Sequence, residues 1–244
     1  MISAVGFLFV LLLCGILTVI SYKFKLLTIS GSLASFGIGS LIGVFGSIDW
    51  LLLLIIFALT GFLATKYKFE VKRKKGLQEG KKGERTYRNV IANGSVPLMV
   101  ALISFATGDQ GSEVAGMAYL CAISVAASDT IASEMGVLSP KVWMITNFKR
   151  VEAGVNGGVS VYGTAWALLG ACFASVVGWA VLFPGTAPDV RVLIPAIVGF
   201  VGCNIDSLIG ATLETWGYVG KLGTNIMSMA LGTALGYITL ILVL

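Results

Sequence analysis

Long runs of apolar residues, separated by short polar stretches, make up most of the chain. The apolar runs cover residues 1–20, 26–46, 50–65, 89–107, 113–134, 158–183, 192–211 and 223–243. A helix needs about 20 mainly apolar residues to cross the hydrocarbon core of a bilayer. The pattern therefore predicts an all-α fold, a polytopic transmembrane helical bundle of about eight spans, or seven. We expect residues 1–244 to form a single membrane-embedded domain.

The polar residues are distributed unevenly between these runs. The only long polar stretch, 66–88, holds ten of the seventeen Lys and Arg residues. Because basic residues gather in cytoplasmic loops, we expect 66–88 to be a basic cytoplasmic loop. With eight spans, sixteen of the seventeen basic residues fall on that side and only Arg191 on the other. This arrangement predicts external termini and a multi-pass protein of the cell membrane.

The composition supports a membrane protein and narrows its chemistry. Hydrophobic residues make up 57% of the chain and charged residues 12%, whereas soluble domains have about 25% charged residues. The chain has no histidine, so it lacks the commonest general base and zinc ligand. A bound metal is then expected to be a hard, oxygen-liganded ion such as Mg²⁺. The four cysteines lie at unrelated spacings in apolar runs, which indicates neither a zinc site nor a disulfide framework.

Several polar side chains lie within the predicted spans, where ionisable groups are costly and usually functional. At a rise of about 1.5 Å per residue, Asp129 and Asp206 come some 6–8 Å below the cytoplasmic boundary of a 30 Å core. Asn93 comes about five residues into a span that starts at the cytoplasmic side, which places it at about the same depth. Asn156 and Asn204 are expected in the same layer. Unpaired carboxylates there are unfavourable by several kcal/mol, so the layer needs partners or cations.

Three interpretations of this layer remain open. A magnesium ion between two aspartates and a polyphosphate would satisfy it. A hydrogen-bond network could instead serve only to hold helices together, and a transporter could use the carboxylates as a proton or ion relay. Transport sites typically lie near the middle of the bilayer with access from both sides, whereas these residues cluster toward one face. Position therefore favours an enzyme over a secondary transporter or flippase.

Two neighbouring features favour a phosphate ligand. Residues 154–158 form a glycine-rich segment before a predicted helix, where backbone N–H groups and the positive helix end can face an anion. Arg85 and Arg88 precede the span that holds Asn93 and are suited to bidentate phosphate contacts. Most of the basic run 72–82 is interpreted as a topology signal attracted to anionic lipid. Nucleic acid is not expected as a partner, because no aromatic residues are interleaved with this run.

Three segments resemble motifs of a known family of integral membrane proteins. They are 128–136 (SDTIASEMG), 154–164 (GVNGGVSVYGT) and 204–211 (NIDSLIGA), with a further similarity at Thr224-Asn225. The family includes the plant phytyl-phosphate kinases together with archaeal and bacterial relatives, and the resemblance extends from about Arg85 to the C-terminus. It implies phosphoryl transfer from a nucleoside triphosphate, CTP or UTP, to an isoprenyl monophosphate, giving the diphosphate. The similar CTP-dependent polyprenol kinases would make an alcohol the acceptor.

For such a reaction we hypothesise a role for each residue of the polar layer. Asp129 and Asp206 would hold Mg²⁺ on the nucleotide, with Glu134 as a third ligand or a support. Asn93, Asn156 and Asn204 would orient phosphate oxygens. The remaining nucleotide-binding candidates are Arg85, Arg88, Gly154, Gly157, Gly158 and Ser160. The prenyl tail is expected in lipid between small-residue helix faces. A homodimer is compatible with the Gly31, Ser35, Gly39 and Gly43 stripe, which equally suits packing within the chain.

Overall fold

The computed structural model describes residues 3–243 and confirms the all-α bundle. Over those residues the structure has nine α-helices. They are α1 Ala4–Lys23, α2 Ile29–Phe45, α3 Ile48–Lys66, α4 Phe69–Lys74, α5 Tyr87–Thr107, α6 Glu113–Gly136, α7 Val161–Leu182, α8 Leu193–Ile209 and α9 Lys221–Val243. A 3₁₀ turn, η1 (Val190–Val192), precedes α8, and a π-helical segment, η2 (Gly210–Glu214), continues it.

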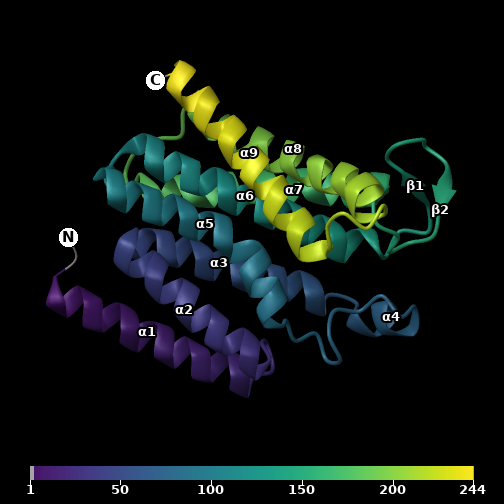
Figure 1. Cartoon of the computed structure of the whole chain (residues 1–244), viewed down its shortest axis with the longest axis horizontal. Helices are drawn as coiled ribbons and strands as arrows, with labels where there is room; N and C mark the ends of the chain where they lie inside the picture. The colour runs from purple at the N-terminus through teal and green to yellow at the C-terminus, as the bar shows by residue number, and fades with distance from the viewer. Residues whose placement is uncertain (1–2, 244) are drawn as a thin grey trace.

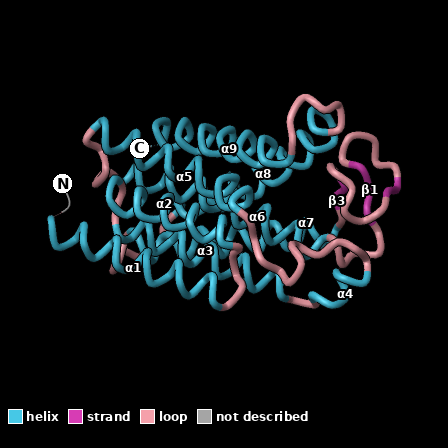
Figure 2. Tube along the Cα trace, turned by 60° about the horizontal axis from the view of Figure 1, so that its bottom comes forward, coloured by secondary structure: helices cyan, strands magenta, loops and turns pink. Residues whose placement is uncertain are grey.

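Seven helical segments are long and apolar enough to cross a membrane, counting α8 together with η1 and η2. The remaining apolar helix, α2, is shorter, with 17 residues. The long helices run roughly side by side along the long axis of the molecule (Figures 1 and 2). Both chain ends lie at the left in Figure 1, and α4 and the strands lie at the right. We call the end with α4 and the strands the polar end.

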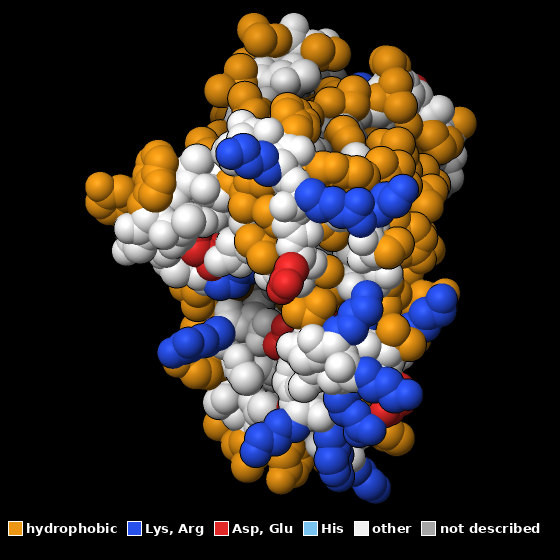
Figure 3. Space-filling view, turned by 90° about the vertical axis from the view of Figure 1, so that its right-hand side faces the viewer, with side chains coloured by type: hydrophobic (Ala, Val, Ile, Leu, Met, Phe, Trp, Pro, Cys, Tyr) orange, Lys and Arg blue, Asp and Glu red, His pale blue; other side chains and the backbone are white. Residues whose placement is uncertain are grey.

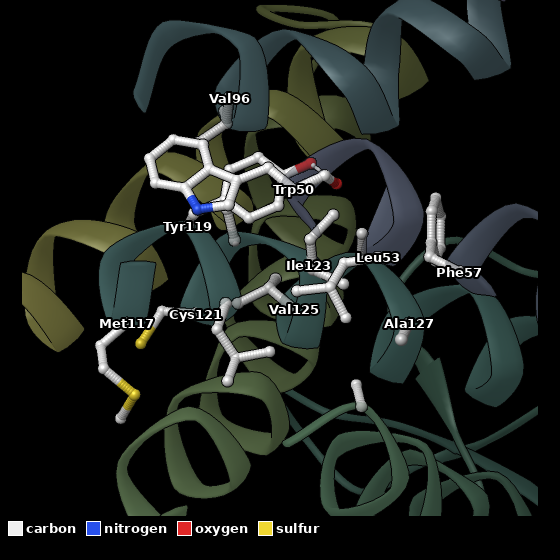
Figure 4. Close-up of a cluster of buried hydrophobic side chains, with 14 of the residues drawn as sticks. Trp50, Leu53, Phe57, Val96, Met117, Tyr119, Cys121, Ile123, Val125 and Ala127 are labelled. Carbon is white, nitrogen blue, oxygen red and sulfur yellow. Dashed lines mark hydrogen bonds between the residues drawn. The ribbon is translucent and has the colours of Figure 1, made fainter. Parts of the chain in front are cut away.

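Helix α6 forms the centre of the bundle. Most of its side chains are buried from Ala115 to Ser128, and many are alanine, glycine, serine or cysteine. Small side chains let neighbouring backbones approach closely, so α3, α5, α7, α8 and α9 all pack against α6. Figure 4 shows the apolar core around this helix, where the Trp50 and Tyr119 rings stack with centroids 4.4 Å apart. The Tyr119 hydroxyl donates to the Trp50 carbonyl oxygen at 2.8 Å, which keeps this buried phenol satisfied.

The basic segment 66–88 is more ordered than a simple loop. It contains α4, and Lys72 in that helix is completely buried. The interpretation of 72–82 as a lipid-attracted topology signal is therefore wrong for Lys72. A side chain with no exposed surface cannot contact lipid headgroups, and its ammonium group contacts other parts of the protein instead.

The connection between α6 and α7 forms a small antiparallel sheet that the sequence pattern does not reveal. Strand β1 (Val142–Met144) lies between β2 (Arg150–Val151) and β3 (Gly158–Val159). Val142 pairs with Val151, and Trp143 pairs with both Arg150 and Val159. The sheet lies at the polar end (Figure 2). Strand β2 precedes the glycine-rich segment and β3 leads into α7, so the sheet holds both ends of the segment.

Candidate functional site

Eight of the twelve predicted site residues line a cavity of about 210 Å³ at the polar end, which we call the carboxylate cavity. Its walls come from α6, the glycine-rich segment, the start of α7, the α8–η2 junction and the start of α9. The predicted residues that line it are Asp129, Gly154, Asn156, Gly157, Gly158, Ser160, Asn204 and Asp206. Segments far apart in the sequence therefore contribute to one cavity, although the role of each residue stays a prediction.

Asp129 and Asp206 form the acidic centre of this cavity. Both side chains line this cavity, so their carboxyl groups interact electrostatically across it. Asp206 is buried and accepts hydrogen bonds from the Ser228 hydroxyl at 3.1 Å and from Lys221 Nζ at 3.2 Å. Two carboxylates this close repel each other unless a cation or a proton intervenes. Lys221 supplies one positive charge beside the two carboxyl groups, and the cavity that they line, of about 210 Å³, has room for a further cation.

The donor set around the pair fits a magnesium ion. Mg²⁺ is usually held by one or two carboxylates, with substrate phosphates and water completing its coordination. Oδ1 of Asn225 is buried and has no hydrogen-bond partner within residues 3–243, and Asn225 lines a second cavity that also reaches Asp129. An oxygen left unpaired in this way is a further candidate ligand. Across the described residues, no three His, Cys, Asp or Glu side chains cluster as a preformed metal site.

Glu134 accepts hydrogen bonds from two other parts of the protein. Its Oε2 accepts from Lys72 Nζ at 2.7 Å, and its Oε1 accepts from the Thr65 hydroxyl at 2.7 Å. Lys72 Nζ also donates to the Ala64 carbonyl oxygen at 2.8 Å. Both carboxylate oxygens are thus occupied by protein donors, and Glu134 belongs to no metal-binding cluster among the described residues. Of the two roles expected for Glu134, metal ligand or support, the structure shows a support: a buried ion pair with Lys72 that joins α4 to α6. Its role as a metal ligand stays a prediction.

The second cavity, the arginine cavity, has a volume of about 470 Å³ and adjoins the first, since Asp129, Ser133 and Lys221 line both. Arg85, Arg88 and Asn93 line it. Arg88 is exposed, whereas Asn93 is buried and donates from Nδ2 to the Asn89 carbonyl oxygen at 2.9 Å. The arginines and Asn93 are therefore separated from the glycine-rich segment by the aspartate pair, and the site has two compartments.

Arg85 is held from both its backbone and its side chain. Its N–H donates to the Leu26 carbonyl oxygen, and its own carbonyl oxygen accepts from the Thr28 N–H, both at 3.0 Å. Nη2 donates to the Gly61 carbonyl oxygen and to the Thr65 hydroxyl, both at 3.2 Å. Burial lowers the pKa of Arg85, while the carboxylates of Glu134, Glu79 and Asp129 act in the opposite direction. An arginine stays charged under such conditions, so Arg85 places a fixed positive charge between these acids.

The glycine-rich segment is shaped by close packing against η2. Gly157 has φ +76°, and a Cβ there would lie 2.3 Å from that of Ala211 in η2. The segment is thus pressed against the π-helical turn that follows Asp206. The expected free amide at Gly158 is not found, because its N–H donates to the Val155 carbonyl oxygen at 2.9 Å. Ser160 caps α7, and its hydroxyl accepts from the Gly163 N–H at 3.0 Å.

Sequence reasoning did not assign several residues of this site. Lys221, Glu214, Ser228 and Glu79 contact or line the cavities. Lys221 begins the last helix and could have been found, since a basic residue at the cytoplasmic end of a span lies near the depth of Asp206. Glu79 lies in the irregular part of the basic segment, where no periodic pattern predicts direction. Burial raises the pKa of its carboxyl group, which Arg85 partly opposes.

The face at the polar end is strongly basic. Figure 3 shows Lys and Arg side chains spread over this face and acidic side chains at a hollow near its middle. An apolar helical bundle with carboxylates, amides and cations gathered at one end defines a multi-pass membrane protein with a site suited to a metal-bound anion.

The chain belongs to the family of integral membrane proteins described as DUF92, which it matches over residues 12–233. It is 30% identical to an uncharacterised membrane protein of Methanocaldococcus jannaschii, with 94% of this chain and 92% of that one aligned. In Arabidopsis thaliana it is similar to protein PGR, at 30% identity over 91% of this chain and 86% of that protein. It is also 29% identical to protein VTE6, chloroplastic, over 85% of this chain and 63% of that protein. No solved structure matches the chain significantly.

Proposed function

We propose that the protein is a membrane kinase that transfers the terminal phosphoryl group of a nucleoside triphosphate, CTP or UTP, to an isoprenyl monophosphate. The observation that supports this proposal is the pair of adjoining cavities that share Asp129 and Lys221. A phosphotransferase needs a place for the donor and a place for the acceptor, with the transferred group between them. The resemblance of the three motifs to the phytyl-phosphate kinases supports the same reaction class.

In this proposal the nucleotide occupies the carboxylate cavity. Asp129 and Asp206 would hold the metal on its phosphates, and Asn204 with Asn156 would orient phosphate oxygens. Bound Mg²⁺ neutralises charge on the triphosphate and makes the nucleoside diphosphate a better leaving group. Lys221 adds a positive charge beside the aspartates. The basic face of the polar end favours the approach of an anionic nucleotide from solution (Figure 3).

The acceptor phosphate would enter the arginine cavity. One of its oxygens attacks the terminal phosphorus of the nucleotide, a new P–O bond forms, and the bond to the β-phosphate oxygen breaks. The products are the prenyl diphosphate and the nucleoside diphosphate. Arg85 and Arg88 would offset the charge of the two reacting phosphates. A monophosphate acceptor is already anionic and needs no strong base, which suits a chain without histidine.

The proposal includes an orientation in the membrane. The polar end carries α4 and the start of α9, and its basic residues predict that it faces the cytoplasm. Both termini lie at the opposite end of the bundle (Figure 1). A cytoplasmic site would have access to soluble nucleotide, while the lipid acceptor reaches it from the bilayer.

A transfer assay tests the function. Purified protein in detergent is incubated with Mg²⁺, a radiolabelled nucleotide, and either geranylgeranyl phosphate, phytyl phosphate or the corresponding alcohols. We expect labelled diphosphate from the monophosphates, and loss of product when EDTA removes divalent cations. Asp206→Asn should lose the activity, whereas Asp109→Asn, an exposed aspartate just after α5, should retain it.

Two results would change the assignment. Product only from the alcohols would make the protein a polyprenol kinase. No transfer with any nucleotide and acceptor, together with proton-coupled uptake in vesicles, would replace the kinase with a transporter.

A further inference from the structure

A third cavity lies among α1, α2, α3 and α5 and has a mostly apolar lining. Its volume is about 190 Å³, and we call it the apolar cavity. Apolar side chains from the first three helices and the turn between α1 and α2 form most of its walls. They include Leu17, Leu27, Ile38, Leu54, Phe57 and Phe62. None of the sequence motifs falls within these walls, since the three motifs begin at Ser128.

One end of the apolar cavity is polar and joins the candidate site. Arg85, Asn89 and Asn93 line both the apolar cavity and the arginine cavity. The three cavities thus lie next to one another in a row, because the arginine cavity in turn shares Asp129 and Lys221 with the carboxylate cavity. A molecule with an anionic head at Arg85 could place an apolar tail among the first three helices.

The guanidinium of Arg85 is placed for such a head group. Among residues 3–243 its hydrogen bonds use only Nη2, so Nε and Nη1 are left for a ligand. Gly61 makes this position possible, since a Cβ there would lie 3.0 Å from Nη1. Gly31 lets α2 approach the backbone of Arg85, because a Cβ at Gly31 would lie 2.6 Å from the Arg85 carbonyl oxygen. Two helices thus hold the arginine at the junction between an apolar cavity and a polar one.

We propose that the apolar cavity binds the hydrocarbon tail of the isoprenyl phosphate acceptor and that Arg85, with Asn89 and Asn93, holds its phosphate. This assignment rests on the proposed kinase function and specifies which part of the protein selects the acceptor. It replaces the expectation of a tail lying freely in lipid between small-residue faces. A charged arginine at the mouth favours an anionic head, and burial of an isoprenoid tail in the apolar part supplies affinity that grows with tail length.

Filling the cavity gives a kinetic test. Ala58 lines it, and Ala58→Phe would place a ring inside it without changing charge. We expect the KM for geranylgeranyl phosphate to rise at least about tenfold, in the range that pocket-filling changes produce. The KM for the nucleotide and the turnover of dimethylallyl phosphate, whose tail is short, should stay unchanged. The matched control is Ala106→Phe, an exposed alanine of α5 away from the cavity, which should leave all these values as in the original protein.

A binding test separates this assignment from the kinase function itself. Geranylgeranyl phosphate with a diazirine on its tail is photolysed with the protein, and labelled peptides are mapped. We expect labels on α1, α2 and α3 that unlabelled geranylgeranyl phosphate removes and an excess of phosphatidic acid does not. Arg85→Gln should weaken labelling for every tail length, because it removes the head-group contact.

The outcomes are distinguishable. Active transfer with labels confined to other helices would overturn the tail site and leave the kinase function intact. Equal competition by phosphatidic acid would make the cavity a general lipid site and also overturn the assignment. Absence of transfer with any acceptor would overturn the kinase function, and the acceptor assignment with it.

Discussion

Helix α6 carries two acidic sites that lie close together and differ in every other respect. Asp129 faces Asp206 at the junction of two cavities, with the partly exposed side chain of Lys221 as the nearby cation. Glu134 lies five residues further along, about 7.5 Å by helical rise. Its carboxylate oxygens accept from Lys72 and Thr65, although its side chain also lines the arginine cavity. The first site opens to ligand-sized space, and the second has a donor on each carboxylate oxygen.

The difference shows that an acidic residue near a membrane-spanning region is not by itself a sign of catalysis. Depth predicts that such a residue needs a partner, but the partner decides its role. Lys72 is completely buried against Glu134, so this pair is complete without a ligand. The aspartates face each other and are incomplete without a cation. Matched substitutions at the two sites would distinguish residues needed for activity from residues needed for stability.

The largest effect is expected at the open site. Asp129→Asn keeps the shape of the side chain and removes the charge, so activity should fall by about a thousandfold, the loss seen for single groups that stabilise transition-state charge. Thermal unfolding in detergent should not become easier, because the change relieves repulsion with Asp206. Glu134→Gln is the comparison variant and should retain measurable turnover. Near-normal activity in Asp129→Asn would contradict the proposed site.

Substitutions in the Lys72–Glu134 pair should lower the stability of the protein more than its activity. Lys72→Met leaves Glu134 buried without its cation, and removal of one partner from a buried pair typically destabilises a protein by about 3–5 kcal/mol. We expect a clearly lower unfolding midpoint, with recovery in the double variant Lys72→Met/Glu134→Leu. Lys74→Met in the same helix, an exposed position, is the matched control. Equal unfolding midpoints for the two single variants would show that the pair contributes little.

A smaller effect is expected where the glycine-rich segment supports the open site. Gly157→Ala should lower kcat/KM for the nucleotide by about tenfold, since small displacements near reacting groups reduce rates strongly. The matched control is Gly217→Ala. A Cβ at Gly217, which has φ +80°, would meet no atom within 4 Å, whereas a Cβ at Gly157, with φ +76°, would meet Ala211. Equal losses in both variants would mean that backbone conformation, and not the contact with η2, explains the effect.

The smallest effect is expected at Glu79, whose carboxyl group lies near the charges of Arg85 and Glu134. Burial raises its pKa from 4.5, so the folded protein holds the proton more tightly than the unfolded chain. Stability from this group is therefore present at low pH and is lost as pH rises through the raised pKa. Glu79→Gln should flatten this dependence and change the unfolding midpoint by at most about 2 °C. An unchanged pH profile in the variant would rule Glu79 out as its source.

The sequence by itself determined the helical membrane bundle and the gathering of its polar residues toward one end. Each apolar run forms a helix with a constant rise per residue, and successive helices cross the bilayer in alternating directions. The position of a residue along its run therefore predicts its depth. This is why Asp129, Asn204 and Asp206 could be predicted in one layer, and why they line one cavity. The glycine-rich segment was placed near them for the same reason, since it precedes a span that starts at the polar end.

Only the tertiary structure decided which polar groups meet within that layer. Lys72 and Glu134 are 62 residues apart, and no periodicity links a residue in the six-residue helix α4 to a distant helix face. The same holds for Gly157 against Ala211 and for Arg85 at the mouth of the apolar cavity. Depth in a membrane depends on one helix at a time, whereas pairing depends on how several helices are rotated and packed together, which side-chain volumes across the whole bundle determine.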